Sequence, residues 1–348
     1  MTADHRRRCA RGAAVLIALL VAPLLVPAAA RAAHVFVSNE DEHTVSVIDT
    51  QRLEVTATIP VGKRPRGLKL SRDGVRLYVA VSGLPKCPPS VPDEECAKLQ
   101  RDLTADGIAA VDTHSLKLLQ LYKAGSDPEQ FDLSREGRRL FVSNEDSATL
   151  TVLDLASGSV VTRIPVGHEP EGVRVAPNGA LVLVTSETDD AVSLIDTHLL
   201  QPVRTLKVGH RPRDAAFTSD GRFAYVTAEF DASVYRVGIG EGGTVEKVLT
   251  LRKEARPMGV LLDEPQHRLY VSTGRGGTIA VIALEGSKLI TEVPVGARPW
   301  GIALSADHRR LFTANGSSND VSVVDTGTLK VIKKIPVGRS PWGVVIGR

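Results

Sequence analysis

The 348-residue sequence predicts an all-β fold: a seven-bladed β-propeller with four antiparallel strands in each blade. Three observations predict it. The chain repeats with a period of about 42 residues, each repeat contains four short β-type runs, and the two ends of the chain each supply part of one repeat. A period of this size made of four strands is typical of a propeller blade.

A proline in the frame Gly-x-x-Pro-x-Gly, or a close relative of it, marks each repeat. Successive framework prolines are 63, 42, 42, 45, 42 and 42 residues apart, so the period is nearly constant with one excess of 21 residues. The framework prolines are Pro65, Pro128, Pro170, Pro212, Pro257, Pro299 and Pro341.

The repeat that begins at Pro170 shows the four runs most clearly. Residues 172–176, 180–186, 191–197 and 202–208 are rich in Val, Leu, Ile and Thr, and they are separated by Gly, Asn, Asp and Pro. Short β-branched runs between turn residues predict strands, and no stretch has a helical period long enough to compete.

The two ends of the chain predict how the ring closes. Residues 339–346 supply only a first strand, whereas 35–39, 44–50 and 55–61 supply only a second, third and fourth strand. We expect these segments to form the seventh blade together, because a ring without this closure would leave two open sheet edges.

The first 32 residues predict a secretory signal peptide. Four arginines within residues 6–11 precede an apolar run over 13–26, and small residues lead up to Ala32. The run is too short and too interrupted by proline for a membrane span. We expect cleavage near Ala32, one propeller domain over 33–348, and a periplasmic or secreted mature protein with no membrane span.

The basic charge of the chain belongs largely to this leader. The whole chain has a net charge of +3, but the leader holds five of its 43 Lys and Arg residues and one of its 40 Asp and Glu residues. The remaining 38 basic and 39 acidic residues give −1. Nucleic acid is therefore not an expected partner.

The excess of 21 residues predicts an insertion over about 82–106 in the first complete repeat. It contains Cys87 and Cys96, which we expect to pair in an exported protein. Such a bridge would stiffen a Pro-rich acidic loop. Long ordered loops are often functional, but an insertion that only resists proteolysis remains an alternative.

The residues beside each framework proline are the candidate site. They should surround one mouth of the central channel, because the innermost strands begin there. Turn geometry does not dictate their identity, since equivalent positions hold Arg, Glu, Met or Trp. The flanking residues are Arg64, Arg66, Asp127, Glu129, Glu169, Glu171, Arg211, Arg213, Arg256, Met258, Arg298, Trp300, Ser340 and Trp342.

Trp300 and Trp342, the two tryptophans of the chain, occupy the same repeat position in adjacent repeats. Beside Arg298 they suit the binding of an aromatic or carboxylate group or of a partner loop. They also suit a plug in a narrowing channel, and both interpretations stay open. The Asp-Thr pairs on the opposite face are interpreted as turn residues.

Residue patterns for metal binding or catalysis are weak or absent in this sequence. His168 and His210 could bind a metal with a nearby carboxylate, but no short-spaced ligand pair supports them, so we do not expect a metal site. The sequence has no G-x-S-x-G, H-E-x-x-H, C-x-x-C-H or phosphate loop. We expect no cofactor.

The second run of each repeat carries a shared signature: LYVA at 77–80, LFVSN at 140–144, AYVT at 224–227, LYVST at 269–273 and LFTAN at 311–315. With VSVIDT at 45–50 and Asp-Thr pairs at 112–113, 196–197 and 325–326, the chain resembles the YVTN family of β-propeller repeats over nearly all of its mature length. Gly238 and Ala283 replace the Asp in two repeats, where we expect differently built turns.

The leader, the seven YVTN repeats and the Cys-containing loop also resemble exported propellers associated with PQQ-dependent alcohol catabolism. This resemblance implies an accessory role beside a quinoprotein dehydrogenase or a transport component, and it transfers no catalytic residue. PQQ itself is not expected to bind, because quinoprotein dehydrogenases resemble eight-bladed propellers rich in Trp.

Three functions remain open. The preferred one is a non-catalytic binding propeller that holds a protein partner or a small organic ligand at the Arg/Trp mouth. The first alternative is a lactonase-type hydrolase that uses Glu129, Glu169, Glu171 and the two histidines around a metal. The second is a non-redox subunit of a quinoprotein dehydrogenase.

Overall fold

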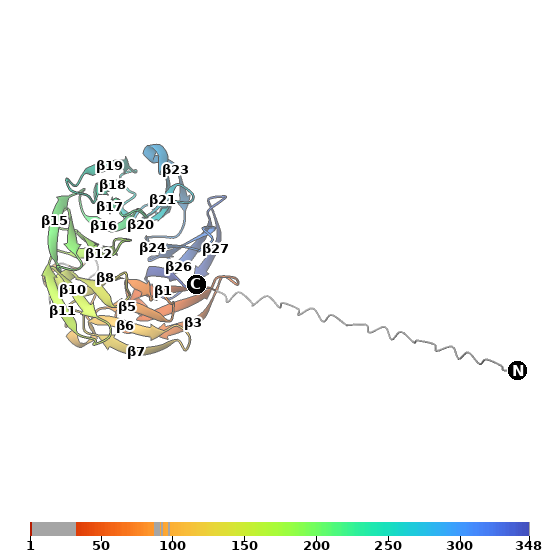
Figure 1. The fold of residues 1–348 in the computed structure, drawn as a ribbon, viewed down its shortest axis with the longest axis horizontal. Helices are drawn as coiled ribbons and strands as arrows, with labels where there is room; N and C mark the ends of the chain where they lie inside the picture. Colours follow the sequence, from red (N-terminus) through yellow and green to blue (C-terminus); the bar gives the residue numbers. More distant parts are fainter. Residues whose placement is uncertain (2–32, 87–90, 92, 97, 348) are drawn as a thin grey trace. The chain divides into compact units, whose positions relative to one another are not determined.

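The structure is a computed structural model that describes Met1 and residues 33–347, apart from 87–90, 92 and 97 (Figure 1). The predicted leader over 2–32 and Cys87 lie outside the described residues. The side chain of Cys96 is not described either, so the signal peptide and the disulfide stay predictions. Within the described part of the chain, no helix is long and apolar enough to cross a membrane.

Residues 33–347 form seven four-stranded antiparallel sheets, and the predicted fold is confirmed. Blade 1 contains β4 (Leu68–Leu70), β5 (Arg76–Val81), β6 (Gly107–Asp112) and β7 (Lys117–Tyr122). Blade 2 contains β8 (Pro128–Leu133), β9 (Arg139–Asn144), β10 (Thr149–Asp154) and β11 (Val160–Pro165). Blade 3 contains β12 (Pro170–Val175), β13 (Leu181–Ser186), β14 (Ala191–Asp196) and β15 (Gln201–Lys207). Blade 4 contains β16 (Pro212–Phe217), β17 (Phe223–Ala228), β18 (Ser233–Gly238) and β19 (Val245–Thr250).

Blades 5 to 7 complete the ring. Blade 5 contains β20 (Pro257–Asp263), β21 (Arg268–Thr273), β22 (Thr278–Ala283) and β23 (Lys288–Pro294). Blade 6 contains β24 (Pro299–Leu304), β25 (Arg310–Asn315), β26 (Asp320–Asp325) and β27 (Lys330–Pro336). Blade 7 contains β28 (Pro341–Ile346), β1 (His34–Asn39), β2 (Thr44–Asp49) and β3 (Glu54–Pro60). Short helical turns occupy connections: η1 (Glu40–Glu42), α1 (Asp93–Cys96), η2 (Leu103–Ala105), η3 (Glu145–Ser147) and η4 (Glu285–Ser287).

The closure of the ring through both ends of the chain is also confirmed. Strand β28 pairs antiparallel with β1, with Val35 opposite Ile346 and Val37 opposite Val344. The sheet order β28-β1-β2-β3 therefore joins the last strand of the chain to the first three. This pairing satisfies the backbone groups that both segments would otherwise expose at sheet edges.

The hydrophobic core lies between the faces of neighbouring blades. Phe36 and Val47 of blade 7 pack with Leu77 and Val111 of blade 1 in one such cluster. The second and third strands are nearly continuously buried, whereas outer strands such as β3 alternate between exposed and partly buried residues. The outer strands lie at the rim of the ring (Figure 1), where one face of each strand meets solvent.

The turns follow the predicted chemistry. Asp49 Oδ1 accepts the backbone N–H of Gln51 at 2.7 Å and of Arg52 at 2.8 Å, and the equivalent aspartates of blades 1, 3 and 6 do the same in their turns. The turns that follow Gly238 and Ala283 differ, as expected: the first is a longer loop closed by a Gly238 N–H to Thr244 O bond, and the second contains η4.

Candidate functional site

The residue before each framework proline has a left-handed backbone in all seven blades, with φ between 42° and 57°. Residues other than Gly, Asn and Asp avoid this region, so a turn alone would not select Arg or Glu there. We call these positions the pre-proline ring. Its members are Arg64, Asp127, Glu169, Arg211, Arg256, Arg298 and Ser340.

The residue after each framework proline forms a second, buried ring, which we call the post-proline ring. All seven members are 2% to 8% exposed. They close the channel and separate a pocket at the mouth from a cavity deeper in the channel. The members are Arg66, Glu129, Glu171, Arg213, Met258, Trp300 and Trp342.

The apolar half of the post-proline ring is a stacked cluster. The rings of Trp300 and Trp342 lie 5.3 Å apart between centroids with an interplanar angle of 26°, and Met258 packs with them. Both tryptophans line the mouth pocket and the deeper cavity. The stacked rings are the floor of the mouth pocket.

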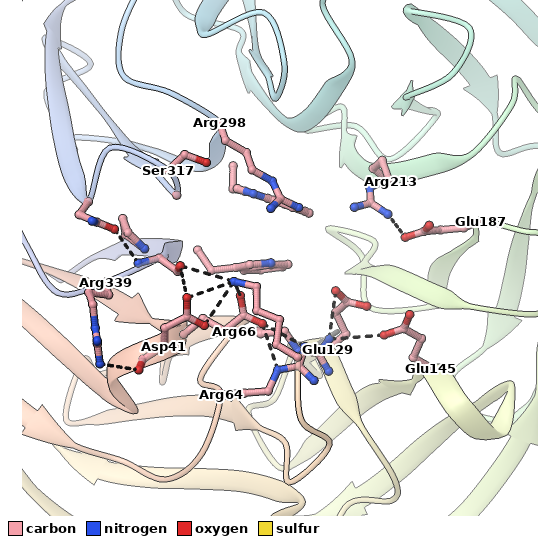
Figure 2. Close-up of a pocket in the computed structure, with 18 of the residues that line it drawn as sticks. Asp41, Arg64, Arg66, Glu129, Glu145, Glu187, Arg213, Arg298, Ser317 and Arg339 are labelled. Carbon is pink, nitrogen blue, oxygen red and sulfur yellow. Dashed lines mark hydrogen bonds and ion pairs between the residues drawn. The ribbon is translucent and has the colours of Figure 1, made fainter. Parts of the chain in front are cut away.

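Two buried arginines organise the polar half. Arg66 Nη2 lies 2.5 Å from Asp127 Oδ1, and Arg66 Nη1 lies 3.4 Å from both Glu129 Oε1 and Glu145 Oε2. These contacts join blade 1 to blade 2, and Figure 2 shows Arg66, Glu129 and Glu145 converging on the same opening. Arg66 is therefore held by three carboxyl groups of the neighbouring blade.

Arg213 of blade 4 repeats this arrangement toward blade 3. Its Nη1 lies 2.9 Å from Glu171 Oε2 and contacts Glu187, and its Nε lies 3.6 Å from Glu229 Oε2. Its guanidinium also lies 5.1 Å from the centroid of the Trp300 ring. Arg213 thus connects the carboxyl groups to the stacked tryptophans.

Several carboxyl groups lie close together in the site, and their pKa values are shifted. The negative charge of Glu129, added to burial, raises the pKa of Glu145 to about 9, even though Arg66 opposes the shift. Burial raises the pKa of Glu171 well above its usual range. The pKa of Glu187 is lowered: burial acts to raise it, but the charge of Arg213 and the hydrogen bond from Glu171 prevail. At neutral pH the site thus contains protonated and ionised carboxyl groups side by side.

The mouth pocket has a volume of about 590 Å³ and a surplus of cations. Its seven basic side chains face five acidic ones, and Glu145 is among the five. The basic residues are Arg64, Arg66, Lys86, Arg211, Arg213, Arg298 and Arg339. The acidic residues are Glu40, Asp41, Glu129, Glu145 and Glu187.

Arg298 differs from the other arginines of the mouth. It is exposed on the rim, and its guanidinium lies 5.1 Å from the centroid of Trp300 (Figure 2). Among the described residues no carboxylate lies within ion-pair distance of it, whereas Arg64 contacts Glu40 at 3.0 Å and Arg211 contacts Glu187 at 2.5 Å. Arg298 is therefore available to an anionic group that lies on the tryptophan floor.

The insertion between β5 and β6 reaches the same face. Lys86 Nζ lies 3.0 Å from Glu40 Oε2, and Arg64 Nη1 donates to the backbone oxygen of Leu84 at 2.6 Å. Farther along the insertion, Arg101 contacts Asp146 of blade 2. The described parts of the insertion thus form one wall of the mouth.

Several predicted site residues lie elsewhere. Glu171 lines the deeper cavity, Arg256 lines a neighbouring groove beside Phe230, and Glu169 Oε2 accepts a hydrogen bond from Thr188 outside the mouth pocket. The exposed His168 and His210 each pair with their own aspartate, Asp189 at 3.2 Å and Asp190 at 3.0 Å.

The metal set considered for a hydrolase is therefore not assembled by the structure. Glu129 and Glu171 are buried beside arginines, while the two histidines point to separate partners. Across the residues that the structure describes, no group of three or more His, Cys, Asp and Glu side chains could hold a metal ion.

Sequence reasoning missed a third set of residues, at the mouth or in the groove beside it, which directly follow the second strand of four blades. They could have been found, because the connection after this strand lies on the same face as the framework prolines and four repeats place Glu there. These residues are Glu40, Glu145, Glu187 and Glu229.

Comparisons with known proteins agree with this architecture. Residues 173–345 match the family described as "Lactonase, 7-bladed beta-propeller", and residues 93–180 match "YNCE-like beta-propeller". The chain is a seven-bladed β-propeller similar to both. Among curated proteins, this propeller is 29% identical to Antigen Lp49 of Leptospira interrogans over 110 residues, which is 32% of the chain and 23% of that protein.

Solved structures show the same fold at low identity. The propeller superimposes on Kuenenia stuttgartiensis hydrazine synthase with a TM-score of 0.71 and 21% identity, covering 84% of this chain and 92% of that one. It superimposes on the Pseudomonas aeruginosa periplasmic gluconolactonase PpgL with a TM-score of 0.69 and 20% identity, covering 91% and 99%. Proteins with such different names share one fold, so function must be argued from the site.

Proposed function

We propose that the mouth pocket binds a small anionic organic molecule, with its carboxylate on Arg298 and its carbon skeleton over the Trp300–Trp342 floor. The available guanidinium of Arg298 above Trp300 carries this proposal. A cation next to an aromatic face, in a pocket with surplus positive charge, suits a sugar acid or a similar hydroxycarboxylate.

The cellular setting is part of the same proposal. The basic, then apolar, then small-residue leader supports export to the periplasm, and PpgL is described as periplasmic. The resemblance to propellers associated with PQQ-dependent catabolism supports an accessory role beside a quinoprotein dehydrogenase or a transport component. In that setting the protein would bind and pass on an oxidation product rather than carry out the oxidation.

Hydrolysis of a lactone in the same pocket is a second candidate, favoured by the protonated carboxyl group beside Arg66. Glu145, with its pKa raised to about 9 chiefly by the charge of Glu129, keeps a proton at neutral pH. It could give this proton to the ring oxygen released when water adds to the lactone carbonyl and the ring C–O bond breaks. The match to the lactonase family over residues 173–345 supports this candidate.

One experiment separates the two candidates. D-gluconate binding is measured by calorimetry and hydrolysis of D-glucono-1,5-lactone by pH-stat, in the wild type, R298A, E145Q and the control R309A. Arg309 is exposed in the turn before β25, away from the mouth. Loss of a charged hydrogen bond should weaken gluconate binding about tenfold or more in R298A only.

The outcomes are distinct. Unchanged gluconate affinity in R298A contradicts the binding proposal. Catalysed hydrolysis that is lost in E145Q while gluconate still binds supports the hydrolase, and the absence of catalysed hydrolysis in the wild type rejects it.

A further inference from the structure

The channel continues beyond the post-proline ring into a second cavity of about 470 Å³, which we call the inner cavity. It is lined by the first strands of all seven blades as they run toward the opposite face of the ring. The buried post-proline ring separates it from the mouth, so it is a different site from the one described above.

One side of the inner cavity is polar because two blades depart from the repeat. The residue two positions after the framework proline is Gly in five blades, but it is Gln130 in blade 2 and Asp214 in blade 4. Arg174, from the blade between them, donates to Gln130 Oε1 at 3.2 Å and lies 2.6 Å from Asp214 Oδ1. Departures from the repeat in three adjacent blades thus meet in one cluster.

Lys69 of blade 1 extends this polar side. Its ion-pair contact among the described residues is Asp132, with 3.4 Å between Nζ and Oδ1. Asp132 already accepts the backbone N–H groups of Leu133 at 3.0 Å and Val175 at 2.9 Å. Burial lowers the pKa of Lys69, against the opposing charge of Asp132. An ammonium has three donors, so this one retains unused hydrogen-bonding capacity.

Asp214 is more fully engaged. Its Oδ1 accepts from Ala215 N at 2.8 Å in addition to Arg174, and its Oδ2 accepts from Val260 N at 3.3 Å. Besides the carboxyl group of Glu171, whose pKa burial raises well above its usual range, the polar side therefore has one paired carboxylate, Asp214, facing the cations Lys69 and Arg174. A ligand that fits here brings acceptor oxygens rather than an amine.

The other side of the inner cavity is apolar. Four positions after the framework proline, blades 1 to 3 carry charged residues, whereas blades 4 to 7 carry Ala216, Leu261, Ala303 and Val345. One residue farther along these strands, toward the opposite face, Phe217, Leu262, Leu304 and Ile346 are only partly buried. Burying these surfaces against an alkyl or aryl body would be favourable.

We propose that the inner cavity binds an amphipathic monocarboxylate, with its carboxylate at Lys69 and Arg174 and its apolar body against the first strands of blades 4 to 7. The site combines a minority of placed polar groups with an apolar wall, which is the usual composition of a small-molecule pocket, and its volume is within the usual range. It is independent of the proposed ligand at the mouth.

Binding of sodium octanoate, acetate and 1-octanol to the full-length protein tests the proposal, by calorimetry and by tryptophan fluorescence. Both tryptophans of the chain line the cavity, so occupancy should change their emission. Octanoate should bind at least about tenfold more tightly than acetate, which lacks the apolar body, and than 1-octanol, which lacks the charge.

K69M should weaken octanoate binding about tenfold or more and leave 1-octanol binding within about twofold. K330M is the matched control, because Lys330 is exposed on the outer strand β27. The double variant K69M/D132N removes both charges of the pair, and it should lose octanoate binding in the same way if K69M alone folds poorly.

Three results would overturn the proposal. The first is that the wild type does not bind octanoate at 10 mM. The second is that the wild type and both Lys69 variants bind octanoate with equal affinity. The third is that octanoate binding is lost in R298A and octanoate is displaced by gluconate. The last result would place octanoate at the mouth. Failure of gluconate to bind at the mouth would leave this test unaffected.

Discussion

Replacing Arg213 by Met should destabilise the propeller more strongly at pH 7 than at pH 5. Arg213 is buried between blades 3 and 4 and contacts Glu171 and Glu187. Its loss leaves the buried Glu187 carboxylate beside Glu171, with Arg211 as its remaining cation among the described residues. That carboxyl group can relieve the penalty by taking up a proton, so the cost of protonating it sets an upper limit to the part of the electrostatic loss that grows with pH.

The limit follows from the ordinary pKa of a glutamate, 4.5. Keeping such a group protonated costs about 1.4 kcal/mol for each pH unit above that value, which is about 3.4 kcal/mol at pH 7 and about 0.7 kcal/mol at pH 5. The sign agrees with linkage. In the wild type the pKa of Glu187 is lowered by Arg213, so its stabilising contribution is present above pH 4.5 and is lost as the pH falls through the lowered pKa.

The free energy of unfolding in urea, measured at pH 7 and at pH 5, checks this for the wild type, R213M and the control R339M. The side chain of Arg339 is 67% exposed, so R339M should change stability by less than about 0.5 kcal/mol at both pH values. A penalty for R213M that is equal at the two pH values, or larger at pH 5, would refute the reasoning.

Three further outcomes are expected. Deleting residues 339–348 removes β28 and opens the ring, so calorimetry should show a melting temperature lower by about 10 °C or more, and an unchanged value would contradict the closure. Because the charge of Glu129 raises the pKa of Glu145 to about 9, the wild type should lose stability between about pH 5 and 9. E145Q should flatten this slope in urea titrations, and an identical slope would contradict the raised pKa of Glu145. Gly301→Ala places a Cβ 2.8 Å from the backbone oxygen of Trp342 and should lower the free energy of unfolding by about 1 to 3 kcal/mol. Gly240→Ala is the control, because its Cβ would have nothing within 4 Å, and it should leave stability nearly unchanged. Equal melting temperatures for the two variants would show that the blades are not packed this closely.

The ring, the number of blades and the closure could be predicted because they depend on period. A framework proline every 42 residues and a split repeat at the ends determine how many sheets form and which ends meet. The same period identified some of the residues that line the mouth pocket, including Arg298 and Trp300. These features need only the spacing of residues along the chain.

Depth in the channel could not be predicted in this way. Positions 298 and 300 are separated by one proline, yet Arg298 is exposed and Trp300 is 8% exposed, and the left-handed backbone before the proline does not decide this, since the equivalent Asp127 is buried. Pairing across blades was equally hidden. Arg66 reaches Glu145, 79 residues away, through the connection after β9, and no local pattern links these two positions.

The channel has two unlike sides, and this asymmetry bears on function more directly than the fold does. Seven identical blades would give a symmetric channel, so information about a ligand must lie where blades depart from the repeat. After the framework proline, blades 1 to 4 carry Arg, Glu, Glu and Arg, and blades 5 to 7 carry Met, Trp and Trp. Deeper in the channel, blades 1 to 3 are charged and blades 4 to 7 are apolar.

The charged residues therefore lie in nearly the same blades at both depths of the channel, and the apolar residues lie in the remaining blades. Turn formation and strand packing make the same demands on the channel-lining positions of every blade and do not account for such a bias. A solvent-filled channel would gain nothing from an apolar wall, and a merely plugged channel would not need buried ion pairs, which cost desolvation free energy. Molecules with one polar and one apolar side, bound along the channel wall, are the occupants that make use of both.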